Sequence, residues 1–285
     1  MRAPRPTQTD SIEREYRRQL LIYQRAYREL VSQGLKELLP HLRKEVSQHT
    51  PQALGEKHAP VERMDADAAK AIQTLFDAIL TRMEKKFPDT LLRRWATAMA
   101  ARTHKTAAKN LAKHAKAATK NAKDGPLEIT GILTSERRLS PYFKNIVDQN
   151  VALIRSIPKE KIPAFTNSLT NAITRDLPIS QTAKLIAKHF EATSNKARLI
   201  ARDQVGKLNG ALDEYHQLQL GVKKYTWRTM KDGAVRHDHR HLEGTVQRWD
   251  RPPIVDKKSG RRAHPKGDIQ CRCYAEAVLS DLLDE

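Results

Sequence analysis

Aromatic residues are scarce in this chain, since Phe, Trp and Tyr together make up 5% of its 285 residues. Charged residues reach 30%, and the mean hydropathy is −0.67. No stretch approaches the roughly 20 consecutive apolar residues of a membrane-spanning helix. The charged start of the chain has no apolar run behind it, so it does not read as a secretory signal. These shortages predict a soluble, helix-rich protein with no membrane partner.

Cysteine is almost absent as well. Cys271 and Cys273 are the two cysteines of the chain, and a single residue separates them. Two cysteines separated by one residue rarely have the geometry of an ordinary disulfide, so the sequence excludes a disulfide scaffold. A reducing cytoplasm is therefore the expected place of synthesis.

Acidic residues are too few to balance the basic ones. The formal net charge is +19 and the pI is about 10.0. Such a surplus destabilises a compact state by self-repulsion unless an anionic partner compensates it. Nucleic acid is the first candidate, an acidic protein surface the second, and anionic lipid a distant third.

The segment from Leu91 to Lys123 has no acidic residue at all. Its basic residues recur every three or four positions among alanines, so on a helix they line one face. They are Arg102, Lys105, Lys109, Lys113, Lys116, Lys120 and Lys123. This basic stripe matches a phosphate backbone in charge and shape, without reading bases. The alternative is a plain solvated lysine face.

Apolar residues at helical spacing predict helices through most of the chain. We expect a helix from Asp10 that Gly34 interrupts and Pro40 stops or kinks, a loop over 47–63, and a helical start near Asp65. Ser194-Asn195 is expected to cap the last long helix. The further helices are expected over 65–86, 91–123, 139–156, 159–175, 180–191 and 194–220.

The pattern changes after Gly221, where alternation over 222–229 predicts a half-buried strand. A second alternating segment, 269–275, is expected to pair with it. The predicted fold class is therefore α+β and predominantly α-helical. The expected domains are a basic helical N-terminal region (1–125), a helical middle region (126–221) and a small α+β subdomain with the His and Cys residues (222–285).

An ordered set of short motifs lies within roughly 130–278. Its residues are Ala197-Arg198, Ile200-Ala201-Arg202-Asp203-Gln204, Asn209, Trp227, Asp232, Arg236, His239, Leu242, Gly244, Pro252-Pro253 and Cys271-Arg272-Cys273. Each motif is weak alone, but in this order the set resembles the phage Mu F-like head-morphogenesis family. The segment His264-Pro-Lys-Gly267 departs from the tighter Pro-Gly of the family.

The resemblance implies a minor head protein with no established enzymatic activity. It implies assembly in the bacterial host cytoplasm, a place in the virion inside the head near the portal vertex, and contact with the portal protein or the major capsid protein. The basic stripe would then face packaged double-stranded DNA without sequence preference.

Cysteine and histidine are preferred zinc ligands, and small domains with thin cores often use zinc to hold them together. His239, Cys271 and Cys273 are the candidate ligands, and we expect the cysteines to lie on a strand. The candidates for a fourth ligand are Asp232, His237, His241 and His264. The alternative is a metal-free core, with buried cysteines and hydrogen-bonded histidines.

Other residues of this region have expected structural roles. Trp227 and Trp249 are expected core anchors, and Arg236 is expected to brace Asp232 or a backbone carbonyl across a turn, or to lie on the surface. Gly244 belongs to the same motif.

A metal-dependent nuclease of His/Cys type is the rival function, because a histidine can activate water beside a metal-bound phosphate. The Asn or paired carboxylates that would place such a metal are not obvious. A chromatin-like or RNA-binding protein would explain the stripe but not the C-terminal motifs.

Overall fold

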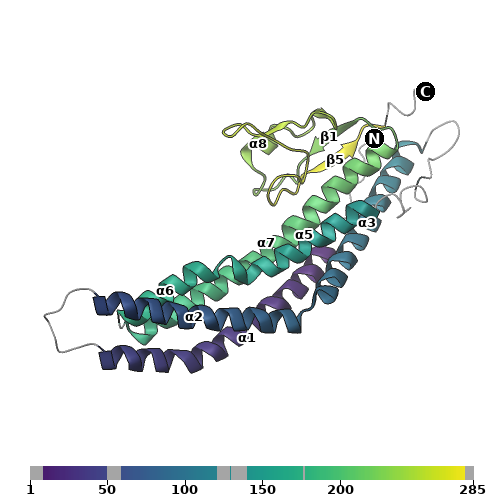
Figure 1. The fold of residues 1–285 in the computed structure, drawn as a ribbon. Helices are drawn as coiled ribbons and strands as arrows, with labels where there is room; N and C mark the ends of the chain where they lie inside the picture. Colours follow the sequence, from purple (N-terminus) through teal and green to yellow (C-terminus); the bar gives the residue numbers. More distant parts are fainter. Residues whose placement is uncertain (1–8, 50–58, 121–128, 130–139, 176, 280–285) are drawn as a thin grey trace. The chain divides into compact units, whose positions relative to one another are not determined.

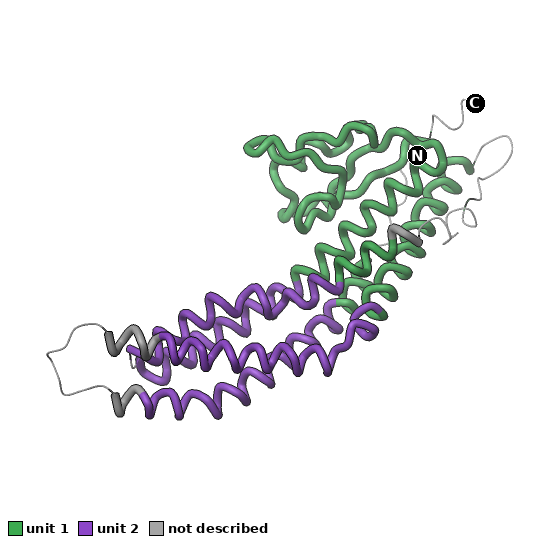
Figure 2. The backbone as a smooth tube through the Cα atoms, in the orientation of Figure 1, with its two compact units in different colours: residues 1–16, 94–150, 199–285 green, residues 17–93, 151–198 purple. Residues whose placement is uncertain are grey.

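The computed structural model describes residues 9–49, 59–120, 129, 140–175 and 177–279, and most of them are helical (Figure 1). The chain forms two compact units (Figure 2). Unit 1 holds 1–16, 94–150 and 199–285; unit 2 holds 17–93 and 151–198. The α+β, predominantly helical class is confirmed, whereas the three sequential domains stay a prediction.

Seven helices of the described residues carry the architecture. They are α1 (Asp10–His49), α2 (Ala59–Lys86), α3 (Asp89–Ala118), α5 (Ser140–Lys159), α6 (Ile162–Thr174), α7 (Ile179–Gln219) and the one-turn α8 (His237–Arg240). Across the described part of the chain, no helix has the length and apolar character that crossing a membrane requires. The expected loop over 47–63 is wrong at both ends, because α1 reaches His49 and α2 begins at Ala59, and residues 50–58 lie outside the described residues.

The expected helix ends at Gly34, Pro40 and Ser194-Asn195 are wrong. Helix α1 continues through Gly34 and Pro40, and a Cβ on Gly34 would lie 2.4 Å from Leu75 Cδ1 of α2. That glycine therefore permits a close approach of two helices. Helix α7 likewise continues through Ser194-Asn195, because buried residues recur at helical spacing across this point and tertiary packing outweighs a local cap signal. They include Phe190, Thr193, Ala197 and Ile200.

Helix α3 ends before its expected limit. It stops at Ala118, and Thr119 donates both its backbone N–H and its hydroxyl to Ala115 O. The segment 119–120 forms a turn. The expected helical end at Lys123 lies outside the described residues.

Unit 2 is built around aromatic packing between α2, α6 and α7. The Phe76 ring meets Phe165 edge-on, with centroids 5.7 Å apart, and the His189 ring stacks on Phe165 at 4.1 Å. Tyr27 of α1 shares a 2.8 Å hydrogen bond with His189 Nε2. Burial lowers the pKa of His189 to about 4, so the ring is neutral at neutral pH.

Unit 1 contains an antiparallel sheet of three strands in the order β2-β1-β5. These are β2 (Val246–Arg248), β1 (Lys224–Arg228) and β5 (Tyr274–Ala277). Strands β3 (Ile254–Asp256) and β4 (Arg261–Arg262) form a separate pair. The expected pairing of the two alternating segments is confirmed by the register of Trp227 with Ala275.

The second strand begins later than expected. Residues 269–270 form a turn, Gln270 has a left-handed backbone with φ of 53°, and Cys271 N–H bonds to Asp268 O at 3.1 Å. Both cysteines therefore precede β5, and the expectation that they lie on a strand is wrong.

Two apolar clusters hold the sheet of unit 1 in place. One joins α3 to the strand ends, with Ala108, Leu111, Ala112 and Ala115 beside Val222, Ala277 and Leu279. The other lies within the sheet region and contains Tyr225, Trp227, Trp249, Val255 and Cys273. Trp227 is fully buried and Trp249 is 4% exposed, so both expected core anchors are confirmed.

Two glycines of α7 provide a matched test of how α7 meets the loop before β5. A Cβ on Gly210 would lie 2.7 Å from Pro265 O, whereas a Cβ on Gly206 would meet Cys271 O at an ordinary 3.9 Å. We predict that Gly210→Ala lowers the free energy of unfolding of unit 1 by about 1–3 kcal/mol through overpacking. Gly206→Ala should raise it by about 0.5–1 kcal/mol, because alanine favours a helix.

Urea unfolding followed by tryptophan fluorescence measures both variants, since all three tryptophans lie in unit 1. Equal effects of the two substitutions would contradict the close approach at Gly210.

Candidate metal centre and its surroundings

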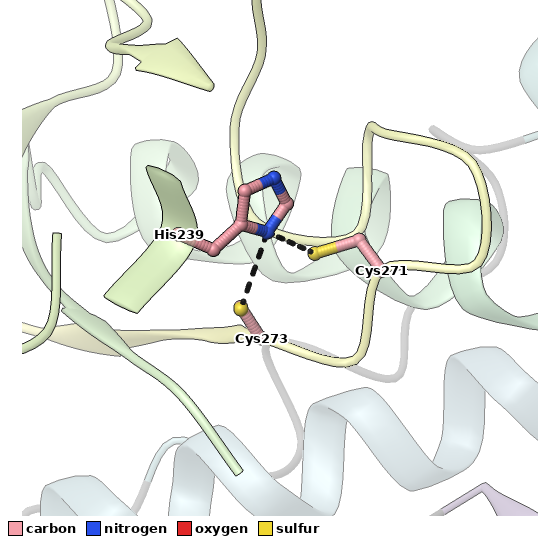
Figure 3. A group of neighbouring side chains, drawn as sticks. All are labelled: His239, Cys271 and Cys273. Carbon is pink, nitrogen blue, oxygen red and sulfur yellow. Dashed lines mark hydrogen bonds between the residues drawn. The ribbon is translucent and has the colours of Figure 1, made fainter. Parts of the chain in front are cut away.

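One imidazole and two thiols converge in unit 1 (Figure 3). His239 Nδ1 lies 3.5 Å from Cys271 Sγ and 3.7 Å from Cys273 Sγ. All three donor atoms lie within 4.8 Å of one another. His239 and Cys273 are 2% and 3% exposed, and Cys271 is half-buried. This is a cluster that can hold a metal ion.

The ring of His239 is placed by α8 and by the sheet. Helix α8 is a single turn that follows the extended residue Arg236, and His239 is its buried side chain. Trp227 of β1 meets the imidazole edge-on, with ring centroids 5.6 Å apart. The fit of α8 against β1 thus turns Nδ1 toward the thiols.

The cysteines are placed by the turn that precedes β5. Gln270 donates its backbone N–H to Asp203 Oδ1 of α7 at 3.2 Å, which ties this turn to the helix. The left-handed conformation of Gln270 reverses the chain just before Cys271. Figure 3 shows both sulfurs on the Nδ1 side of the ring.

The other ring nitrogen of His239 faces a buried carboxylate. His239 Nε2 lies 3.4 Å from Asp268 Oδ2, and the Asp268 side chain is 2% exposed. Arg236 Nη1 and Arg261 Nη2 pair with the same carboxylate at 2.5 and 3.0 Å. His239 Nε2 makes no hydrogen bond among the described residues, so Asp268 acts on the ring through its charge. The donor set and this support both fit a metal.

Protons in the cluster are shared unevenly. The thiol of Cys273, and then His239, form hydrogen bonds that lower the pKa of Cys271. The bond to Cys271, together with burial, raises the pKa of Cys273. The hydrogen bond from Cys271 raises the pKa of His239. The two thiols therefore differ in acidity, and a cation bound by both sulfurs would release protons from them.

None of the four candidates for a fourth ligand joins the group of three among the described residues. Asp232 pairs with Arg272 at 2.7 Å, and His264 Nδ1 bonds to the Tyr225 hydroxyl at 2.8 Å. His237 and His241 are exposed and lie 3.3 Å apart through their Nε2 atoms. The described protein ligands therefore number three.

The remaining motif residues have structural contacts. Arg236 Nη2 donates to Ile269 O at 2.6 Å, which confirms the expectation that Arg236 braces a backbone carbonyl. Its ion pair is with Asp268 and not with Asp232. Gly244 has a φ of 77°, and its N–H donates to Trp227 O at 2.8 Å. That left-handed turn closes the loop between β1 and β2, where glycine is favoured.

Most of the basic stripe lies on the exposed side of α3. Its members on the helix are Arg102, Lys105, Lys109, Lys113 and Lys116, and Lys120 follows in the turn after the helix. All six are exposed, and Lys123 lies outside the described residues. The opposite side of α3 is buried at Ala107, Ala108, Leu111 and Ala115. The stripe is thus separate from the apolar face that packs in unit 1.

Comparison with known proteins identifies the C-terminal half. Residues 164–276, from α6 to β5, match the family described as Phage Mu protein F like protein. This region is similar to that family, and we refer to it as the Mu F-like region. The resemblance seen in the sequence is confirmed over a narrower span than 130–278, and it supports a phage head-related protein. Both cysteines, His239 and Asp268 lie in the Mu F-like region, whereas the stripe lies outside it.

A protein of Haemophilus influenzae, described as an uncharacterized protein, is 27% identical over 168 residues. The match covers 59% of this chain and 36% of that protein, so the chain spans about a third of the relative's length. No solved structure matches this chain.

Asp268 is the site residue that sequence reasoning missed. It precedes Cys271 by three residues, and a carboxylate at that spacing before a Cys-x-Cys motif was the available signal. Its partners Arg236 and Arg261 come from other segments, so the spacing alone does not indicate an ion-pair cluster. Arg202 also lies beside the three candidate ligands, although the sequence indicates only that it belongs to the motif Ile200–Gln204.

We predict that Asp268→Asn lowers the free energy of unfolding of unit 1 by roughly 1–3 kcal/mol, because buried hydrogen-bond donors lose a charged acceptor. Asp250→Asn is the control, since Asp250 pairs with Arg248 on the surface, where the two side chains are 63% and 60% exposed. An exposed pair contributes about 0–1 kcal/mol. Urea unfolding measures both variants, and a control as costly as Asp268→Asn would refute the central role of this carboxylate.

Proposed function

We propose that this protein is a minor head component of a phage that acts in head morphogenesis at or near the portal vertex and catalyses no reaction. The Mu F-like match over 164–276 carries the proposal. In support, Trp227, Arg236 and Gly244 make packing, ion-pair and turn contacts that stabilise a fold. The proposed place is the interior of the head, and the proposed protein partners are the portal protein or the major capsid protein.

We further propose that α3 contacts packaged double-stranded DNA without sequence preference. Five exposed basic side chains follow one side of α3 from Arg102 to Lys116, Lys120 follows in the turn after the helix, and the opposite side of α3 is buried. No acidic residue lies between Leu91 and Lys123, so the segment that carries the row contributes no opposite charge of its own. Binding of this kind depends on phosphate contacts and on the release of counterions.

The test of the DNA contact replaces Lys105, Lys109, Lys113 and Lys116 by Glu. We expect salt-sensitive binding to a random duplex to be lost, with the helical circular dichroism retained. Each contact removed should reduce the slope of log affinity against log salt by about 0.9. A fluorescence anisotropy titration at several salt concentrations measures the slope.

A control variant carries the same change of net charge elsewhere. Lys36, Lys44, Lys70 and Lys85 are exposed lysines of α1 and α2, and their replacement by Glu removes the same four positive charges and adds the same four negative ones. If both variants lose DNA binding equally, net charge alone attracts DNA, and the proposed contact between α3 and DNA is wrong.

We propose that the metal of the cluster is zinc in a structural role. Two thiolates and one imidazole are typical zinc ligands, and the buried Asp268 behind His239 provides the outer support that such sites have. Three of the residues that position these ligands, Trp227, Arg236 and Asp268, also belong to the fold around the sheet. A metal here would add binding free energy to the stability of unit 1.

Elemental analysis of the purified protein should find about one zinc per chain. Chelation should lower the unfolding midpoint seen by tryptophan fluorescence, which reports unit 1, because the metal joins α8 to the turn before β5. If the protein is purified without metal and added zinc does not change its unfolding midpoint, the alternative of a metal-free, hydrogen-bonded core is correct.

The head role and the rival nuclease predict opposite results for two histidines. His237 is 80% exposed, whereas His239 lies in the core. We predict that His237→Ala leaves soluble yield and head assembly unchanged, and that His239→Ala or Cys273→Ala lowers both. Heads purified from lysates of the parent phage, examined by electron microscopy and mass spectrometry, measure assembly and the presence of this protein.

A nuclease would instead cleave plasmid DNA in the presence of Mg²⁺, Mn²⁺ or Zn²⁺ and lose cleavage in a well-folded His239→Ala protein. We expect no cleavage by the wild type. Cleavage that disappears in folded His239→Ala would overturn the structural role.

A further inference from the structure

A cavity opens beside the three candidate ligands. It has a volume of about 320 Å³, and His239, Cys271 and Cys273 all contribute to its wall. Asp268 does not line this cavity, since it faces the other nitrogen of the imidazole. A metal held by Nδ1 and two sulfurs therefore has three protein ligands and, on the cavity side, a free fourth position. Zinc sites with three protein ligands take water or a substrate at such a position.

The wall of this cavity is strongly basic. Arg202, Arg236 and Arg272 contribute to it, and no Asp or Glu is among the described residues that line it. Two of these arginines are already paired, Arg236 with Asp268 and Arg272 with Asp232. Arg202, which is half-buried on α7, has no ion pair or hydrogen bond with any described residue. Its five N–H donors are available to a ligand.

From these contacts we propose that the metal centre is open, and that its fourth ligand is an oxygen of a phosphate group held by Arg202. This inference rests on the proposed zinc site. Two thiolates neutralise the charge of a zinc ion, so attraction for an anion must come largely from the arginines. A guanidinium binds phosphate oxygens in a bidentate manner, and it does so strongly where water is partly excluded.

The phosphate could be a free ion or the end of a nucleic acid strand, because both present the same oxygens. A carboxylate would be a weaker match for a site that must bind both the metal and Arg202, since it carries one charge and a single pair of oxygens. The cavity is large enough for a terminal phosphate with part of its sugar, judged against the roughly 300 Å³ at which ligand pockets begin.

Cobalt substitution tests the proposal on the full chain. Co²⁺ replaces zinc in such sites, and its visible bands report the ligands of the metal. We expect inorganic phosphate to shift these bands with saturation in the wild type, while the thiolate-to-cobalt band in the near ultraviolet remains. In Arg202→Ala the apparent Kd for phosphate should rise at least tenfold, and Arg202→Lys should recover part of the loss because it keeps the charge.

The matched control is Arg198→Ala. Arg198 lies one turn earlier on α7, and its side chain bonds to Asn195 outside this cavity. It should bind phosphate as the wild type does. Absence of a spectral shift in the wild type, an equal shift in Arg202→Ala, or an equal response to acetate would each overturn the proposal. Cobalt content, measured first, separates these outcomes from failure of the metal site itself.

A pair of short oligonucleotides distinguishes the sources of the phosphate. If the ligand is a strand end, a 5′-phosphorylated oligonucleotide shifts the bands at a lower concentration than inorganic phosphate, and the unphosphorylated strand has no effect. If the ligand is the free ion, inorganic phosphate acts at the lower concentration.

Discussion

The small sheet region of this protein depends on one buried charge. The carboxylate of Asp268 is 2% exposed, and a buried charge is tolerated only when it is paired and hydrogen-bonded. Arg236 precedes α8, Arg261 lies on β4 and His239 on α8, so one carboxylate joins two segments that are distant in the sequence. The same carboxylate lies 3.4 Å from the imidazole whose other nitrogen faces the thiols. Stability and the geometry of the candidate metal centre therefore have a common cause.

The sequence indicates local features of this site well and its long-range support poorly. The grouping of His239 with Cys271 and Cys273, the pairing of the two alternating segments and the burial of Trp227 follow from residue type and spacing. The ion pairs of Asp268 do not, because they depend on how loops return to one another. The fourth-ligand candidates failed for the same reason: His264 is near in sequence but is engaged by Tyr225.

The errors in the helices have a different origin. Gly34 and Ser194-Asn195 are signals of helix ends in an isolated peptide, yet α1 and α7 continue through them. At Gly34 the missing side chain admits Leu75 of a neighbouring helix, so the glycine serves packing and not an end. Burial that recurs at helical spacing was the more reliable indicator, since tertiary contacts supply most of the stability of a helix.

The cluster beneath β5 has a consequence for how this protein can be divided. Ala108, Leu111, Ala112 and Ala115 of α3 cover Val222, Ala277 and Leu279, yet α3 lies outside the Mu F-like region at 164–276. A fragment cut at the boundaries of that region would keep Val222 but lose α3, Ala277 and Leu279, so the side chain of Val222 would lose the apolar partners that bury it. A fragment that is to fold by itself, or to carry the metal centre into another protein, therefore has to be longer than the matched region and to include α3 and the residues up to Leu279.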